Sequence, residues 1–208
     1  MVLSESMSSA DPSCAMRGLS RFRRRLGTEM CEVLPGLFLG SLRDATDDEQ
    51  IKRNRIKCIL SVHELTAEHP AHSACRVLRL PLSDCPSVNI AAHFSQTNDF
   101  IHEARCREEA VLVHCLAGVS RSACVVVAYL LTVTDLSYFS ALSLVASCRP
   151  VVNPNFGFRM QLAKFAEKGV RKERDRLRDS CGRSRFDAQF DLDKEIIAAG
   201  YRAGGRTA

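Results

Sequence analysis

Short apolar runs alternate with amphipathic segments through the middle of this 208-residue chain. The apolar runs are four to eight residues long and rich in Val, Ile and Leu, which is typical of buried strands. We predict strands at Val33–Gly40 (with a Pro35-Gly36 turn in it), Ile56–Val62, Arg76–Leu82 and Val111–His114. Strands that alternate with helical segments predict an α/β fold, in which a central mixed sheet of about five strands is flanked by helices on both sides.

The helical segments differ in how much of their surface is apolar. The helix predicted from Asn89 onward carries Ile90, Phe94 and Ile101 on one face, so we expect that face in the core. The segment Ser122–Val133 is apolar on all sides, which is typical of a fully buried helix. Further helices are predicted at Asp44–Arg53, at Tyr138–Cys148 with Leu142, Val145 and Ala146 inward, and after Asn155 with Phe158, Leu162 and Phe165 on one face.

Composition narrows the class of protein. The length and the 46% hydrophobic content predict one domain with tails. The net charge of +5 fits an anionic substrate only loosely, and we expect no nucleic-acid partner. The ten cysteines have no paired spacing, and neither a secretory signal nor an apolar run of membrane length is present. We therefore expect free thiols in a reducing compartment, the cytoplasm, with the nucleus as a second location.

Charged segments flank the predicted domain. Residues 1–29 are predicted to be a disordered basic tail, with five arginines between positions 17 and 25. We prefer a solvated tail over a transit peptide or a membrane-surface patch. Residues 30–178 form the predicted catalytic domain, and residues 179–208 a C-terminal extension with an amphipathic piece, Phe186–Ala199. The alternating charges from Arg171 to Asp179 predict a solvated helix end.

The sequence from Val111 to Ser122 carries the clearest chemistry. Cys115 closes an apolar strand, and Arg121 stands six positions later at the start of a helix, with five uncharged residues between them. Such a loop can turn its backbone N–H groups toward one point, and the positive end of the helix is directed at the same point. A phosphate fits there, held by the guanidinium of Arg121, and the same field stabilises the Cys115 thiolate as a nucleophile.

A carboxylic acid follows another predicted strand. Asp84 lies in the loop after Leu82, from which its side chain can reach over a bound phosphate and protonate the leaving oxygen. An ordinary turn Asp before Pro86 is equally consistent with this position.

Side chains of metal-ligand type occur in one polar loop, as His63, His69, His72 and Cys75. Their spacing matches no standard zinc site, so we predict an ordinary loop and expect neither a metal nor a cofactor.

The segment HCLAGVSRS resembles the His-Cys-x5-Arg-Ser/Thr signature of the protein tyrosine phosphatase superfamily. From about Leu34 to about Leu177 the chain resembles the small atypical dual-specificity phosphatases. The other landmarks are LPGLFLG, LSVH, LPLSD and NPNFGF, in this order along the chain. The resemblance implies a protein tyrosine phosphatase-like fold, and hydrolysis of phosphotyrosine and of phosphoserine or phosphothreonine through a phospho-cysteine intermediate.

The resemblance also implies roles for individual residues. Cys115 would be the nucleophile and Asp84 the general acid, while Ser122 would donate a hydrogen bond to the thiolate. His114 would orient the site, and Asn155 would either brace the loop or cap the following helix, two alternatives that the sequence leaves open. The implied phosphate-binding residues are Leu116, Ala117, Gly118, Val119, Ser120 and Arg121.

The loop between Cys115 and Arg121 carries no Lys, which favours phosphoproteins over inositol lipids as substrates. Kinases of mitogen-activated signalling are the partners that the resemblance suggests, and we expect a monomer. Members of the family that begin with Met-Gly carry a myristoylation pattern. Here Gly27 is internal and the chain starts with Met1-Val2, so no stable membrane anchor is expected from this N-terminus.

Two functions from other classes compete with this hypothesis. A pseudophosphatase would bind phosphoproteins without cleaving them, and a sulfur-transfer domain also uses a cysteine loop. Intact Cys115, Arg121 and Asp84 argue against the first, and Arg121 with Asp84 against the second. A reactive Cys115 is also open to oxidation, with Cys85 and Cys124 as candidate resolving thiols.

Overall fold

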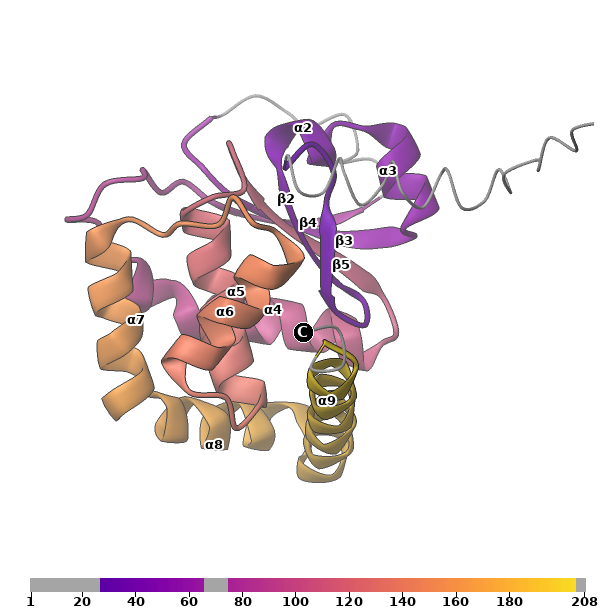
Figure 1. Cartoon of the computed structure of the whole chain (residues 1–208), viewed down its shortest axis with the longest axis vertical. Coiled ribbons are helices and arrows are strands. Elements are labelled where there is room, and N and C mark those ends of the chain that lie inside the picture. The colour runs from indigo at the N-terminus through magenta and orange to yellow at the C-terminus, as the bar shows by residue number, and fades with distance from the viewer. Residues whose placement is uncertain (1–26, 66–74, 205–208) are drawn as a thin grey trace, which may run out of the picture.

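A five-stranded mixed sheet forms the centre of the molecule, as the computed structural model shows for residues 27–65 and 75–204 (Figure 1). The strand order is β1-β2-β5-β3-β4; β1 and β2 are antiparallel, and all other neighbours are parallel. The strands are β1 (Cys31–Leu34), β2 (Leu37–Ser41), β3 (Ile56–Val62), β4 (Arg76–Leu80) and β5 (Ala110–Cys115). The predicted α/β class with a sheet of five strands is confirmed.

The segment predicted as one strand with a Pro35-Gly36 turn in it is two strands, because the chain reverses fully at that turn. Val33–Gly40 is part of a hairpin of β1 and β2, and the Pro35-Gly36 turn joins the two strands. Gly36 has a φ of +75°, a conformation that a residue with a Cβ rarely adopts. The predicted turn therefore ends β1 and starts β2.

The predicted helix at Asp44–Arg53 is also two elements, α2 (Leu42–Ala45) and α3 (Asp48–Arg53). Asp47 interrupts it, because its carboxylate accepts hydrogen bonds from the backbone of Glu49 and Gln50 and so caps a new helix. The remaining helices are η2 (Ile90–His93), α4 (Phe94–Cys106), α5 (Arg121–Val133), α6 (Tyr138–Cys148), α7 (Phe156–Lys168), α8 (Val170–Cys181) and α9 (Arg183–Gly204).

Helices cover both faces of the sheet, as predicted (Figure 1). Helix α5 is buried along its whole length and contacts α4, α6, α7, α8 and β5, so it forms the centre of the larger core. A smaller core, which includes Phe38, Ile51 and Ile59, lies where α2 and α3 cover the sheet. The buried α5 fixes the loop that precedes it, because the first residue of a packed helix cannot shift without moving its neighbours.

Within the described residues, no helix is both long enough and apolar enough to cross a membrane. The basic segment between positions 17 and 25 and the two loop histidines His69 and His72 lie outside the described residues.

The predicted solvated helix end at residues 171–179 is wrong for its inward face. Helix α8 buries Glu173 and Leu177. The carboxylate of Glu173 accepts hydrogen bonds from Ser95 (2.6 Å) and Asn98 (3.0 Å) of α4. The alternating charges hide this role, because a carboxylate that pairs with another helix looks the same in sequence as a solvated one.

The C-terminal helix α9 packs against the same body. Phe186 joins the larger core, and the carboxylate of Asp193 is fully buried. Arg105 of α4 donates two hydrogen bonds to Asp193, at 2.8 and 2.7 Å, and a third to the Tyr129 hydroxyl at 3.1 Å. This bidentate pair, closed off from water on both sides, joins the predicted extension to the helices of the domain.

We predict that Asp193→Ala destabilises the protein by roughly 3–5 kcal/mol, because it leaves the buried guanidinium of Arg105 without its partner. Asp191→Ala, on the exposed side of the same helix, should cost less than about 0.5 kcal/mol. Urea denaturation followed by circular dichroism measures both. Equal unfolding midpoints for the two variants would show that α9 does not stabilise the domain.

Candidate active site

The loop between β5 and α5, which we call the phosphate loop (Cys115–Arg121), lies at the carboxyl end of the central strand. Gly118 has a φ of +68°, and a Cβ there would stand 2.5 Å from the carbonyl oxygen of Gly40. Only glycine fits this close approach to β2, so the loop turns back sharply toward Cys115. Four successive loop carbonyls, those of residues 116–119, accept hydrogen bonds from Leu42, Arg149 and Asn153.

The Cys115 sulfur is almost fully buried and is surrounded by donors. The Ser122 hydroxyl and the Gly118 backbone N–H both lie 3.2 Å from it. Burial raises the pKa of the Cys115 thiol, but hydrogen bonds from Ser122 and from the amides of Val119 and Gly118 outweigh it and lower that pKa below its usual value. The predicted nucleophile and Ser122 therefore meet in a geometry that favours the thiolate.

Asp84 faces the phosphate loop across the site. Its Oδ1 accepts hydrogen bonds from the Ser120 hydroxyl (2.6 Å) and from Nδ2 of Asn155 (2.8 Å). Its Oδ2 lies 3.7 Å from Nε of Arg121, with about a third of the carboxylate side chain exposed. These contacts place the predicted acid beside the loop and leave it open to solvent and substrate.

Asn155 serves both of the alternatives that its sequence position left open. Its Oδ1 accepts from the backbone of Phe158 at 3.0 Å and caps α7, while its backbone N–H donates to the Ser120 hydroxyl at 3.1 Å. Since its Nδ2 also donates to Asp84, one side chain connects the start of α7 to the carboxylate at the loop.

Arg121 and His114 hold the two ends of the phosphate loop. The Arg121 side chain is buried, and its Nη1 donates to the Leu82 carbonyl at 3.0 Å, which ties the loop to the segment that carries Asp84. The buried His114 ring pairs through Nε2 with the Ser61 hydroxyl of β3 at 2.7 Å. That contact fixes the residue next to Cys115 to the neighbouring strand.

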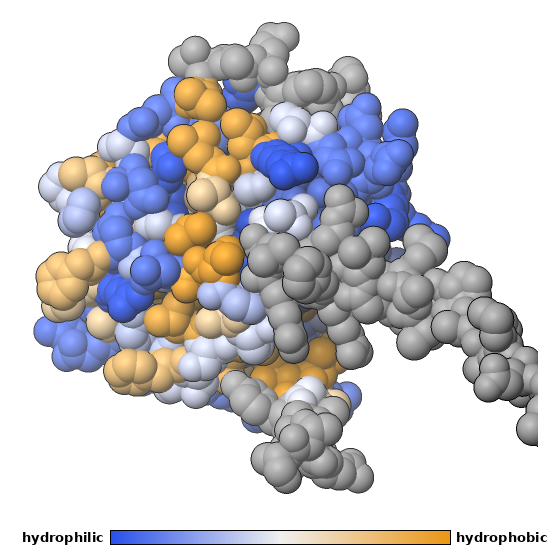
Figure 2. Space-filling model, turned by 45° about the horizontal axis from the view of Figure 1, so that its top comes forward, coloured by the Kyte–Doolittle hydropathy of each residue, from blue (hydrophilic) through white to orange (hydrophobic). Residues whose placement is uncertain are grey.

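An open depression of about 640 Å³ adjoins the loop. Asp84, Ser120 and Asn155 line it together with Phe156 and Arg159, two residues that the sequence gave no reason to select. Phe156 is one of the exposed large apolar side chains of the described residues. On the face of the molecule drawn in Figure 2, apolar patches lie between polar ones. A substrate chain that crosses the loop would meet an aromatic ring and a cation here.

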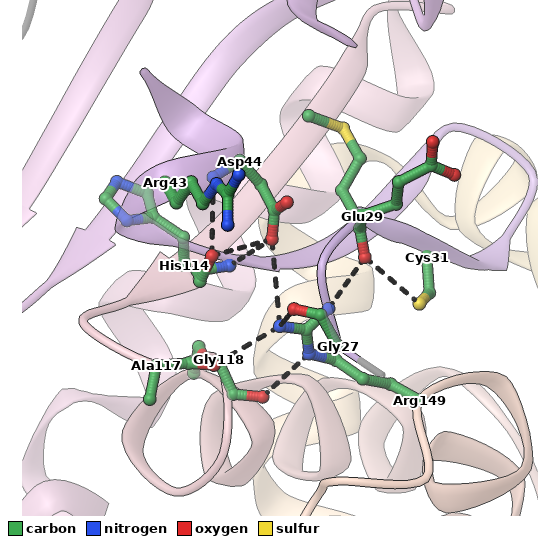
Figure 3. A network of polar contacts seen from close by, with 12 residues as sticks. Gly27, Glu29, Cys31, Arg43, Asp44, His114, Ala117, Gly118 and Arg149 are labelled. Atoms are coloured by element: carbon green, nitrogen blue, oxygen red, sulfur yellow. Dashed lines mark hydrogen bonds and ion pairs between the residues drawn. The ribbon is translucent and has the colours of Figure 1, made fainter. Parts of the chain in front are cut away.

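Arg149 contacts the phosphate loop but was not selected from the sequence. Its fully buried side chain donates to the carbonyls of Ala117 and Gly118 (Figure 3). The only signal was a charged residue next to a Pro at a helix end, which is common at exposed positions as well.

The remaining candidate ligands do not form a site in the described residues. His63 lies near His114, with 5.4 Å between the ring centroids, and within 27–65 and 75–204 no group of three or more His, Cys, Asp or Glu could hold a metal ion. Of the candidate resolving thiols, Cys124 is fully buried on α5, and burial raises its pKa well above the usual value. Cys85 is exposed, and a hydrogen bond with Ser87 lowers its pKa.

Comparison with known proteins places this geometry in a family. Residues 37–168 match the family model described as dual specificity phosphatase, catalytic domain. The chain is 43% identical over 174 residues to dual specificity protein phosphatase 22 of Homo sapiens, covering 84% of this chain and 93% of the relative. It is 41% identical over 167 residues to dual specificity protein phosphatase 15 of Mus musculus, covering 80% of this chain and 70% of the relative.

A solved structure agrees with the sequence matches. The crystal structure of DUSP15 superimposes with a TM-score of 0.70 at 42% sequence identity, covering 74% of this chain and 97% of the other. The match extends from sequence to backbone geometry, so the resemblance seen in the motifs is confirmed.

We predict that Ser122→Ala raises the pKa of the Cys115 thiol, because it removes a hydrogen bond that favours the charged form. In wild type, alkylation of Cys115 by iodoacetate should reach its plateau at a lower pH than alkylation of an ordinary thiol. The pH profile of the variant should shift toward higher pH. Inactivation rates measured across pH report this, and Ser143→Ala on the exposed side of α6 is the control. Identical profiles for Ser122→Ala and wild type would contradict the assignment.

Proposed function

The chain belongs to the dual specificity protein phosphatase family, and we propose that it hydrolyses phosphoproteins with Cys115 as nucleophile and Asp84 as general acid. Its enzyme class is that of cysteine-dependent protein tyrosine/serine/threonine phosphatases. The single observation that carries the residue assignment is the pair of donors on the Cys115 sulfur, Ser122 and Gly118, with Asp84 held beside the same loop by Ser120.

In the first step, the Cys115 thiolate attacks phosphorus in line with the leaving oxygen. A sulfur–phosphorus bond forms as the phosphorus–oxygen ester bond breaks. The amides of residues 116–121 and the Arg121 guanidinium hold the three equatorial oxygens, on which negative charge accumulates. Protonated Asp84 gives its proton to the leaving oxygen, so the substrate leaves as a neutral hydroxyl.

In the second step, water attacks the phospho-cysteine. Asp84, now a carboxylate, takes a proton from that water, and the sulfur–phosphorus bond breaks to return the thiolate and inorganic phosphate. The Ser122 hydroxyl, 3.2 Å from the sulfur, stabilises the thiolate as it leaves. Both steps use the loop amides and the Arg121 guanidinium as donors, because negative charge accumulates on the equatorial phosphoryl oxygens in each step.

The environment of the loop supports phosphoproteins as substrates. The loop presents backbone amides and a single guanidinium, without the additional lysines that further phosphates on an inositol ring would need. Asp84 is partly exposed and the adjoining depression is open, which suits the short side chains of phosphoserine and phosphothreonine as well as phosphotyrosine. The residues around the loop therefore favour a shallow site on a protein surface.

The cellular setting is part of the proposal. Free thiols and a low-pKa nucleophile require a reducing compartment, which supports the cytoplasm and nucleus as locations. Signalling phosphoproteins, including kinases of the mitogen-activated type, are the proposed partners of a monomeric enzyme. We propose residues 30–178 as the catalytic domain, with residues 1–29 as a tail and residues 179–208 as an extension that contributes α9.

We predict that the protein hydrolyses a small aryl phosphate without added metal. Cys115→Ser should lower kcat by at least about a thousandfold, because an alcohol is a far weaker nucleophile than a thiolate. Asp84→Ala should lower kcat by about 10²–10⁴-fold, since the leaving oxygen then departs unprotonated. Asp48→Ala, at an exposed position of α3, should leave the rate unchanged. Full activity in Cys115→Ser would overturn the mechanism.

Phosphopeptides test the substrate class. Peptides of one sequence with phosphotyrosine, phosphoserine or phosphothreonine should all be hydrolysed, and strict preference for phosphotyrosine would contradict the shallow site. A protein that binds these peptides tightly but releases no phosphate would be a binding module instead. Release of thiocyanate from thiosulfate and cyanide would indicate a sulfur-transfer domain.

A further inference from the structure

Arg149 is the largest of the fully buried side chains, and its surroundings are unusual for a guanidinium. It follows α6 directly, and its carboxylate neighbour Asp44 lies 3.7 Å away, beyond hydrogen-bond distance. The hydrogen bonds of Arg149 go instead to four backbone carbonyls, those of Gly27, Glu29, Ala117 and Gly118. Burying a cation away from water has a high free-energy cost unless hydrogen bonds compensate it. Because main-chain oxygens supply those hydrogen bonds here, the positions of these carbonyls are strongly constrained.

Two of these carbonyls belong to the phosphate loop. Nη2 donates to the Ala117 oxygen at 3.2 Å, and Nε donates to the Gly118 oxygen at 3.0 Å. The planar fork of the guanidinium therefore grips two consecutive peptide units at once. Figure 3 shows the Arg149 guanidinium between the loop residues Ala117 and Gly118 on one side and Asp44 and Glu29 on the other.

Holding a carbonyl also orients the N–H of the next residue. The C=O of one residue and the N–H of the next form one rigid trans peptide unit, in which they point in opposite directions. The unit gripped at the Ala117 oxygen carries the Gly118 N–H, which donates to the Cys115 sulfur at 3.2 Å. The unit gripped at the Gly118 oxygen carries the Val119 N–H, which is one of the groups that lower the pKa of the Cys115 thiol.

The same guanidinium is also held by the residues that precede β1. Nη1 donates to the Glu29 carbonyl at 2.7 Å, and Nη2 to the Gly27 carbonyl at 3.0 Å. Asp44, the acidic neighbour, is itself fixed by the backbone and hydroxyl of Ser41 at 2.7 and 2.8 Å. The guanidinium thus spans from the residues before β1 to the loop, and leaves little freedom to either.

We propose that Arg149 is a positioning residue that holds the amides of Gly118 and Val119 toward the Cys115 sulfur and the substrate phosphate. It acts through their peptide planes and touches neither the sulfur nor the substrate. The proposal rests on the proposed function of the loop, since the orientation of those amides affects catalysis only if Cys115 is the nucleophile. It also implies that Gly27 and Glu29, at the end of the predicted tail, support the site, because their carbonyls accept hydrogen bonds from the Arg149 guanidinium.

The test compares Arg149→Met with Arg105→Met, which removes another buried arginine, one whose hydrogen bonds go to Pro35, Tyr129 and Asp193 and not to the phosphate loop. Both should destabilise the protein, but only Arg149→Met should disturb the loop. We expect its kcat/KM for an aryl phosphate to fall by about 10- to 100-fold. We also expect its inhibition constant for inorganic phosphate to rise, and its profile of inactivation by iodoacetate to shift toward higher pH.

The pH profile separates positioning from simple loss of stability. The charged and titratable groups around the sulfur, namely Asp84, Arg121 and His114, are the same in every variant, so a shift specific to Arg149→Met reports the amides. Below the melting temperature of each folded variant, reduced stability alone moves neither the thiol profile nor the phosphate inhibition constant. Unchanged values of both in Arg149→Met would overturn the proposal.

Arg149→Lys decides the question if Arg149→Met does not fold. It keeps the buried positive charge near Asp44, but a single ammonium cannot reproduce the planar two-carbonyl grip. Loss of phosphate affinity and a shifted profile in Arg149→Lys would support positioning, and wild-type values of both would contradict it. If wild type itself shows no hydrolysis that depends on Cys115, the proposed function fails, which is a result distinct from failure of the Arg149 proposal.

Discussion

Buried backbone carbonyls need donors, and in the phosphate loop that need creates the anion site. The oxygens of Ala117 and Gly118 are satisfied from behind by Arg149, and the oxygens on either side of them by backbone N–H groups. Since each trans peptide directs its N–H away from its C=O, satisfying the acceptors on one side presents the donors on the other. The proposed phosphate site is thus a consequence of how the rest of the fold satisfies the carbonyls of one loop.

The stability of the Cys115 thiolate depends on the balance between burial and hydrogen bonding. Burial of Cys115 by itself would keep the thiol protonated, and only the donors directed at the sulfur reverse this. Desolvation also makes those hydrogen bonds strong, because no water competes for the sulfur. The site therefore needs both a dry position, supplied by β5 and α5, and an exact placement of amides, supplied by the loop and its supports.

Polar contacts between distant segments carry much of this support. Arg149 joins the residues before β1 to the loop, Asn155 joins α7 to Asp84, and Arg105 joins α4 to α9 through Asp193. Each of these polar side chains joins two elements that also pack through apolar contacts. Apolar contacts are not directional, so the hydrogen bonds add a constraint on the relative position of the two elements. Asp84 and Cys115, the proposed general acid and nucleophile, keep their relative position because the elements that carry them are connected in this way.

Several features followed from the sequence alone, because they depend on neighbouring residues. The spacing of Cys115, Arg121 and Ser122, the all-round apolar α5 and the strand at Ile56–Val62 are local patterns, and each is present as predicted. The Pro35-Gly36 turn was predicted as well, although the reversal into a hairpin was not. The break at Asp47 was missed because one cap residue outweighs the helical pattern around it.

Only the tertiary structure decided the contacts between residues far apart in the chain. Asp84 meets Ser120 and Asn155 across 36 and 71 positions, and Arg149 reaches Glu29 across 120. An arginine on a solvated helix and one buried against the phosphate loop have the same side chain. They differ in which backbone carbonyls the folded chain brings within hydrogen-bond distance, and a linear pattern of polar residues contains no such distances.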